Sequence, residues 1–257
     1  MRWIVGLVAI VILSSAAPVR AERLVVSLSN HRVAVTSSFV GEDLVLFGTI
    51  EPDAGISLRP GNYDIVVTVA GPAKTYRTRR KARVAGIWVN VDSREFIRVP
   101  AYLSILSNRA TTDVTNPEVA RRLQLGLDNF LLTQRVGSDF ADTVRDDPFR
   151  AAFVHLETQS GLYSQRSSGV TFLTSSVFRA NIPVPANAPV GNYAIEVKLF
   201  ANGGLVARTT SAFEIIKAGF EQYVADAAAN QGLLYGLATA ILALLTGWFA
   251  SVVFRRD

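Results

Sequence analysis

The stretch 232–254 near the C-terminus constrains this chain more than any other feature. It reads GLLYGLATAILALLTGWFASVVF and contains no charged residue. As a helix it would be roughly 34 Å long, which is enough to cross the hydrocarbon core of a bilayer, about 30 Å thick. The sequence therefore predicts a single transmembrane helix over residues 232–254, and the rest of the chain must lie on one side of a membrane or the other.

The residues beside this helix predict its orientation. Arg255 and Arg256 follow it directly, whereas Glu221 and Asp226 precede it. Basic residues next to membrane helices usually lie in the cytoplasm. We therefore expect residues 255–257 to form a short cytoplasmic tail, so that any signal passed inward would go through a partner protein.

Small residues recur along one face of the predicted helix at steps of three and four. This spacing lets two helices approach closely in lipid, although glycine and alanine are also common in membrane helices that have no partner. The pattern is compatible with both interpretations, and in the first the helix would contact an integral membrane protein or a second copy of the chain. The residues are Gly232, Gly236, Ala240, Ala243, Gly247 and Ser251.

The N-terminus has the pattern of a secretory signal. Arg2 precedes an apolar run over residues 4–13 that is too short to span a bilayer, and a small residue, Ala21, ends the segment. We expect cleavage after Ala21, and an uncleaved anchor would place the domain in the same compartment. Either way, the main domain would lie outside the cytoplasm.

Charge and cysteine content narrow the function classes. The formal net charge is +5, and it falls to +3 when residues 1–21 and their two arginines are removed. A charge this small gives no reason to expect nucleic acid as a partner. The sequence has no cysteine, so the domain outside the membrane, about 210 residues, must be held together by its core alone.

Short segments rich in Val and Ile, separated by turn residues, predict strands over 23–107 and 170–217. The segment YDIVVTV alternates as a half-buried antiparallel strand does. Gly-Asn-Tyr opens both this segment, at Tyr63, and YAIEVKL, at Tyr193, which suggests two similar hairpins whose corner tyrosines bond to backbone. The expected fold class is mainly β: an immunoglobulin-like antiparallel β-sandwich, one or two, with a two-helix insertion and a C-terminal transmembrane helix.

Two helices are predicted between the strand-rich regions. Asn116-Pro117 and Asp147-Pro148 are cap-proline pairs that begin helices, and the first helix has an apolar stripe from Val119 to Leu131. The expected organisation is a signal peptide (1–21), a first β-sandwich region (22–110), a helical insertion (111–165), a second β-sandwich region (166–218), a juxtamembrane helix (219–231), the transmembrane helix (232–254) and the tail (255–257).

One row of basic residues is the best candidate for an anion site. Arg77, Arg79, Lys81 and Arg83 alternate, so on a strand they project from one face. Planar guanidinium groups suit oxyanions, and such a row is suited to a phosphate, a sulfate-like anion or a lipid headgroup. A solvated face or a charged edge that prevents strand pairing is the favoured alternative.

We expect no binding or catalytic role for the remaining candidate residues. Trp88 lies in a run of Ile and Val and is expected to be a core anchor. His31 and His155 are expected to be exposed, and Asp139, Asp142, Asp146 and Asp147 lack the spacing of a calcium loop, so neither a metal nor another cofactor is expected. Carboxylates such as Asp113, Glu157 and Glu214 form no recognisable catalytic pair, and the prediction is that the protein is not an enzyme.

Several segments together resemble a known family. They are FVGEDLVLFG (39–48), VAGIWVN (84–90), VFRANIPVP (177–185), GNYAIEVKLF (191–200) and GWFASVVFRR (247–256). They are similar to the alphaproteobacterial "putative transmembrane protein" family, which defines no catalytic or binding residues. The resemblance implies a bacterial inner-membrane protein with its bulk in the periplasm, and an accessory role beside a permease similar to sulfite exporters, which would make the row from Arg77 to Arg83 worth testing.

Two functions follow as hypotheses. The first is a non-enzymatic, membrane-anchored periplasmic module that binds an inner-membrane permease. The alternative is an envelope assembly or chaperone-like factor that binds extended chains along an exposed sheet edge.

Overall fold

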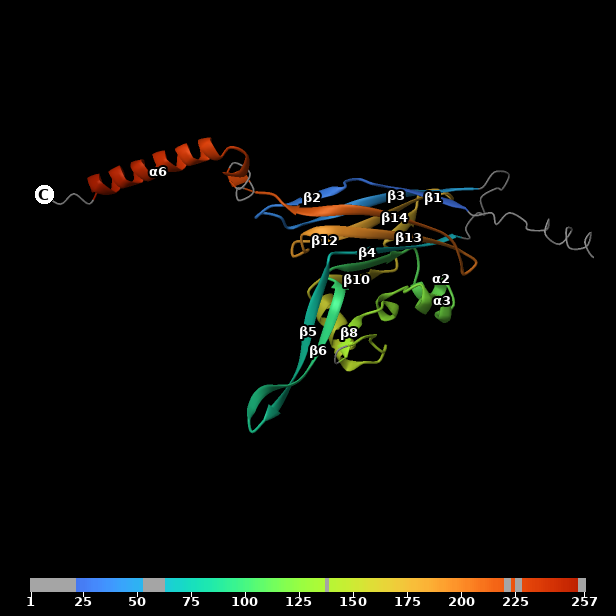
Figure 1. The fold of residues 1–257 in the computed structure, drawn as a ribbon. Coiled ribbons are helices and arrows are strands. Elements are labelled where there is room, and N and C mark those ends of the chain that lie inside the picture. The colour runs from blue at the N-terminus through green and yellow to red at the C-terminus, as the bar shows by residue number, and fades with distance from the viewer. Residues whose placement is uncertain (1–21, 53–62, 137–138, 220–222, 225–227, 254–257) are drawn as a thin grey trace, which may run out of the picture.

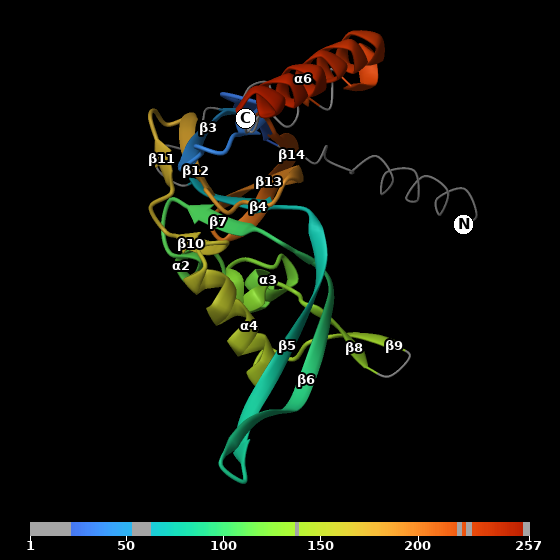
Figure 2. The ribbon, with the colours of Figure 1, turned by 90° about the vertical axis from the view of Figure 1, so that its left-hand side faces the viewer.

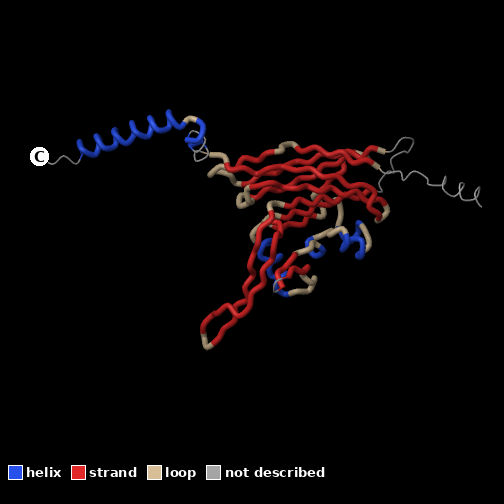
Figure 3. The backbone as a smooth tube through the Cα atoms, viewed as in Figure 1, coloured by secondary structure: helices blue, strands red, loops and turns tan. Residues whose placement is uncertain are grey.

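The computed structural model describes residues 22–52, 63–136, 139–219, 223–224 and 228–253. A β-sandwich forms the body of the molecule, and helices and a long hairpin lie against one side of it, as Figures 1 and 3 show. A final helix follows the last strand further along the chain.

The sandwich has two sheets. The outer sheet has the order β1-β3-β12-β11 and the central sheet the order β10-β7-β4-β13-β14-β2. The outer strands are β1 (Arg23–Leu28), β3 (Gly41–Glu51), β11 (Val170–Phe172) and β12 (Val177–Pro185). The central strands are β2 (Arg32–Val35), β4 (Tyr63–Ala70), β7 (Leu103–Ser107), β10 (Tyr163–Arg166), β13 (Gly191–Ala201) and β14 (Gly204–Lys217).

This strand order is that of an immunoglobulin-like sandwich. The outer sheet corresponds to strands A, B, E and D, and β4, β13 and β14 correspond to C, F and G, with β7 extending the sheet beyond C. Both sheets contain strands from residues 22–110 and strands from residues 166–218, with β3 paired to β12 and β4 paired to β13. The expected mainly β, immunoglobulin-like fold is therefore confirmed, and the two strand-rich regions form one sandwich.

The predicted corner tyrosine is confirmed at Tyr193. Its hydroxyl donates to the carbonyl oxygen of Pro189 at 2.6 Å, and its ring stacks on Phe213 with 4.8 Å between the ring centres. This bond fixes the turn that leads into β13. The hydroxyl of Tyr63 donates instead to the carboxylate of Glu22 at 2.7 Å.

The central sheet is buried on both faces. Its first face packs on the outer sheet, where Ile65 and Val67 lie in the sandwich core. Its second face packs on a second core that contains Val66 and Phe200. The prediction that β4 is half-buried was therefore wrong, because helices and the base of the hairpin cover the face that the alternation left to solvent.

The helices of the insertion are short. They are α2 (Thr111–Val114), α3 (Pro117–Arg122), the 3-10 helix η1 (Leu127–Asn129) and α4 (Pro148–Gln159). Both predicted caps are present: Asn116 accepts from the amide of Val119, and Asp147 accepts from the amides of Phe149 and Arg150. The first helix was predicted to reach Leu131, but α3 ends at Arg122.

Its early end has a backbone cause. Gln124 and Gly126 adopt positive φ angles of 54° and 92°, which end α3 and redirect the chain. The insertion also contains strands that were not predicted, β8 (Thr133–Val136) and β9 (Asp139–Asp142).

A third sheet, with the order β5-β6-β8-β9, leaves the sandwich. It is built on a hairpin of β5 (Ala73–Val84) and β6 (Ile87–Pro100), which begins beside α4 and extends well past it (Figure 2). Ala85 and Gly86 form its two-residue turn with φ angles of 48° and 86°, the signs of a type I′ turn. We refer to residues 79–92 as the hairpin tip.

The last element is α6 (Gly232–Val253). It is the one helix among the described residues that is long and apolar enough to cross a membrane. The predicted signal peptide (1–21) and cytoplasmic tail (255–257) lie outside the described residues, as does part of the predicted juxtamembrane helix (219–231).

Candidate functional site

The basic row lies on β5 in the alternating arrangement that the sequence predicts. Across the hairpin, Arg77 is opposite Glu95, Arg79 opposite Ser93, Lys81 opposite Asn90 and Arg83 opposite Trp88. Opposed residues on antiparallel strands project from the same face. The row, Trp88 and Glu95 therefore share one face of the hairpin.

The charge on this face is neutralised near the sandwich and free near the tip. Glu95 lies 3.5 Å from Arg77 and 3.2 Å from Arg135 of β8, so one carboxylate bridges two guanidinium groups. Within the described part of the chain, Arg79 and Lys81 form no ion pair. The positive charge that is not already paired with a carboxylate therefore lies nearer the end of the hairpin than Arg77 does.

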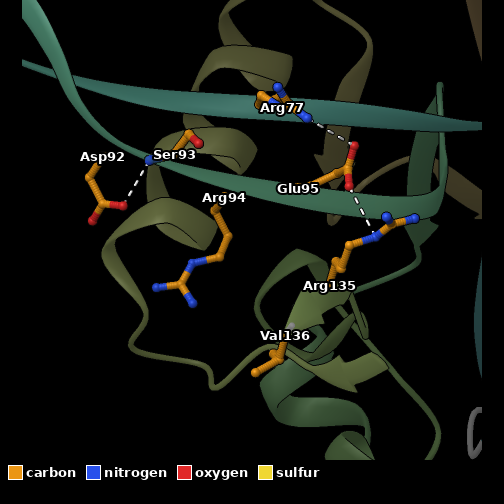
Figure 4. Close-up of a pocket in the computed structure, with 7 residues that line it drawn as sticks. All are labelled: Arg77, Asp92, Ser93, Arg94, Glu95, Arg135 and Val136. Atoms are coloured by element: carbon orange, nitrogen blue, oxygen red, sulfur yellow. Dashed lines mark hydrogen bonds and ion pairs between the residues drawn. The ribbon is translucent and has the colours of Figure 1, made fainter. Parts of the chain in front are cut away.

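Two open hollows accompany this arrangement. Figure 4 shows the larger, about 510 Å³, which is lined by Arg77, Asp92, Ser93, Arg94, Glu95, Arg135 and Val136. The neighbouring hollow, about 370 Å³, is lined by Arg77, Arg79, Asn90, Val91, Asp92 and Ser93. Both contain carboxylates, and an anion would have to compete with Asp92 and Glu95 for the basic groups. This arrangement favours an ion-pair network over a closed anion pocket.

Arg94 in the larger hollow already has partners. Its guanidinium lies 5.2 Å from the ring centre of Phe149 and 3.8 Å from the carboxylate of Asp147. It thereby joins the hairpin to the start of α4, which is a structural contact.

The hairpin tip contradicts one prediction. Trp88, expected to be a core anchor, is 69% exposed, and Ile87 and Val84 beside it are 65% and 51% exposed. Its alternating apolar neighbours are typical of a buried strand, but the hairpin extends beyond the domain that would have buried them. The tip was therefore missed as a candidate surface.

The small-residue stripe lies on a helix that the described part of the domain does not bury. The apolar window of α6 is 0% buried. A Cβ added to Gly232, Gly236 or Gly247 would meet no atom within 4 Å beyond its chain neighbours and its own helix backbone. Thr239 and Thr246 turn their hydroxyls back onto backbone carbonyls one turn earlier, at 3.0 and 2.6 Å, which satisfies these groups without water.

The titratable candidates are dispersed. Among the residues that the structure describes, no three His, Cys, Asp or Glu side chains come together as metal ligands. Asp113, Glu157 and Glu214 lie on α2, α4 and β14. Both histidines are exposed, as predicted.

The side chains with shifted pKa values lie in or beside the two hydrophobic cores. Burial raises the pKa of the Tyr102 hydroxyl to about 12, and also raises the pKa values of Tyr163 and Tyr193. The first two hydroxyls donate to the backbone carbonyls of Pro183 and Pro100. Burial likewise raises the pKa of Glu157. The three tyrosines thus have structural hydrogen-bonding roles.

Together these features define a class of protein: an immunoglobulin-like domain with a projecting hairpin, joined to one apolar helix of membrane-spanning length. The chain belongs to the family described as "Putative transmembrane protein (Alph_Pro_TM)", which matches residues 23–256. This match confirms the resemblance found in the sequence.

Comparison with curated proteins finds no match. Among solved structures, the chain is similar to the N-terminal domain of the Streptococcus gordonii adhesin Sgo0707, with a TM-score of 0.28, 8% identity and coverage of 76% of this chain and 32% of that one. The collagen adhesin of S. aureus gives a TM-score of 0.15, 8% identity and coverage of 77% and 93%. Neither likeness is close enough to bear on function.

Proposed function

We propose that this protein is a non-enzymatic module anchored in the bacterial inner membrane by α6, with its β domain in the periplasm and its C-terminus in the cytoplasm. It acts as an accessory subunit of an integral membrane protein. The observation that carries the proposal is that no residue in the apolar window of α6 is buried. A Cβ added to Gly232, Gly236 or Gly247 would meet no atom beyond its chain neighbours and its own helix backbone. Lipid covers such a helix, and another helix can pack on its small-residue face.

The nature of the partner comes from the resemblance. A permease similar to sulfite exporters is the first candidate, and the basic row on β5 is the region of the domain suited to contact an anionic substrate near its exit. No nucleic acid or cofactor is included in this proposal.

The alternative, capture of extended chains on a sheet edge, has less support. The edge strand β11 is only three residues long, and the edge strand β5 carries the basic row. Short edges and edge charges both discourage pairing with another strand.

Copurification tests the proposal. The tagged full chain is extracted in mild detergent beside a version with an unrelated transmembrane helix, and bound proteins are identified by mass spectrometry. We expect one membrane protein with the native helix and its loss with the replacement. Recovery of many envelope proteins with either helix would instead support the sheet-edge alternative, and recovery of the untagged chain alone would indicate a homo-oligomer.

Substitutions within the stripe locate the contact. Gly236→Leu combined with Gly247→Leu adds bulk on the small-residue face, and we expect at least a tenfold loss of the partner while membrane insertion is kept. Ala238→Leu is the matched control, since two residues further on it projects from roughly the opposite side of the helix. Equal recovery with all three forms would contradict a contact through this face.

A further inference from the structure

The hairpin tip combines exposed apolar side chains that the described fold leaves uncovered. Trp88, Ile87 and Val84 flank its turn, and Val91, 46% exposed, follows on β6. None of these four residues belongs to either hydrophobic core. A tryptophan with aliphatic neighbours at the end of a projecting element is a costly arrangement in water and implies a surface that covers it.

The charge around these side chains indicates what that surface is. Arg79, Arg80, Lys81 and Arg83 lie on the β5 side of the tip, and Asp92, which lies 3.9 Å from Arg80, is the one acidic residue in residues 79–92. Arg83 is directly opposite Trp88 in the strand register. The tip therefore has excess positive charge immediately beside its indole ring.

The position of the tip fits a membrane. In Figure 1 the hairpin slants towards the side of the sandwich on which β14 ends. Figure 2, viewed from that side, shows α6 above the sheets and the end of the hairpin below them. Residues 218–231 join β14 to α6 and, fully extended, would span at most roughly 50 Å. The linker thus keeps the end of β14 within that distance of the bilayer that holds α6.

We propose that the hairpin tip is a second membrane contact, which inserts Trp88 and Ile87 among the headgroups of an anionic phospholipid bilayer while Arg79, Lys81 and Arg83 bind lipid phosphates. Tryptophan favours the membrane interface, and each basic residue near an anionic surface adds about a fivefold gain in binding. Because α6 tethers the tip, weak binding suffices: the contact forms within one molecule at high effective concentration.

This inference rests on the anchoring of α6 and not on a permease partner, so it is tested with the purified full chain alone. Trp3→Phe and Trp248→Phe leave Trp88 as the only tryptophan. The protein is reconstituted in vesicles of phosphatidylcholine with and without phosphatidylglycerol, each including a brominated lipid that quenches nearby indole. We expect blue-shifted, quenched emission with phosphatidylglycerol; emission typical of water and no quenching in either vesicle would overturn the proposal.

Paired variants separate charge at the tip from charge elsewhere. In the single-tryptophan chain, Arg79→Gln with Lys81→Gln is expected to shift the equilibrium about 25-fold towards the detached tip. Arg122→Gln with Arg179→Gln, at two exposed positions away from the hairpin, removes the same charge and should leave quenching unchanged. Equal effects of the two pairs would show that the tip has no specific role.

A protein surface is the other class of partner that would cover the hairpin tip. Photo-crosslinking in native membranes distinguishes protein from lipid. A photo-crosslinking amino acid at position 88 should label phospholipid. Predominant crosslinking to a protein would overturn the lipid contact, whatever the result of the copurification experiment, in which the contact is formed by α6.

Discussion

At the scale of single residues, Glu157 on α4 is a partly buried carboxylate whose charge destabilises the fold. One of its carboxylate oxygens is buried and has no hydrogen-bond partner in the described structure. Burial raises its pKa above the ordinary carboxyl value, and the same charge contributes to the raised pKa of Tyr163. The ionised side chain is therefore held at some cost to stability.

The raised pKa of Glu157 makes the stability of the folded chain depend on pH. The folded state binds the Glu157 proton more tightly than the unfolded chain does, so stability falls as the pH rises from the ordinary carboxyl pKa through the raised one. We expect Glu157→Gln to raise the melting temperature at neutral pH and to leave it nearly unchanged near about pH 4. Thermal unfolding at both pH values measures this difference.

Glu42→Gln is the control, because Glu42 lies at an exposed position on β3. Its effect should be small at both pH values. A neutral-pH melting temperature that is unchanged or lower in Glu157→Gln would show that the ionised carboxylate has favourable partners.

Other residues show which structural features the sequence can predict and which it cannot. Asn116 and Asp147 were recognisable as caps because each precedes a proline, and that signal is local. Trp88 was misplaced because its exposure depends on how far the hairpin projects, which no local pattern records. Glu157 has no signal at all, since its burial comes from β5 and β10 packing against α4.

At the scale of elements, β4 shows the same limit. Its alternation predicts one buried face, but the chain supplies a cover for the other. Asp64 on that second face accepts a hydrogen bond from the side-chain amide of Asn108 at 3.0 Å and pairs with Arg109. Both partners follow β7, more than 40 positions along the sequence, so the burial of Asp64 could not be read from the strand itself.

Two neighbouring valines of β4 test this double burial. Val66 and Val67 are each 0% exposed and project into different cores. We expect Val66→Ala and Val67→Ala each to lower the free energy of unfolding by about 2 kcal/mol, because each removes two buried carbon atoms and leaves a cavity. Chemical denaturation of the full chain in detergent measures both.

Val25→Ala on β1 is the control, because Val25 is 40% exposed and should cost well under 1 kcal/mol. If Val66→Ala behaved like this control while Val67→Ala was costly, the second face would not be packed in solution.

At the scale of the whole molecule, the sandwich was predictable, whereas the projection of the hairpin from it was not. Turn spacing, strand composition and the Tyr193 corner indicate an immunoglobulin-like domain. The departure occurs where such a domain would have a short connection between strands C and C′, β4 and β7 here. This chain inserts β5 and β6 at that point, and turn residues alone do not reveal that the two strands leave the sheet.

The hairpin tip should be separable from the folded core. Replacing residues 80–92 by Asn-Gly keeps the pairing of Arg79 with Ser93 and closes it with a favourable two-residue turn. The removed side chains lie outside both cores, so we expect the free energy of unfolding to change by less than about 0.5 kcal/mol. Thermal unfolding measures this, and a large loss would mean that the tip stabilises the third sheet.

The placement of β14 has a mechanical consequence. It is the strand that leads to the anchor, and it pairs antiparallel with β13 over nearly its whole length and parallel with β2 at its end. Tension between the anchor and a load on the domain would pull β14 along its own axis, so the hydrogen bonds on both sides would be sheared together rather than opened one by one. A domain attached in this way resists being unravelled from its tethered end.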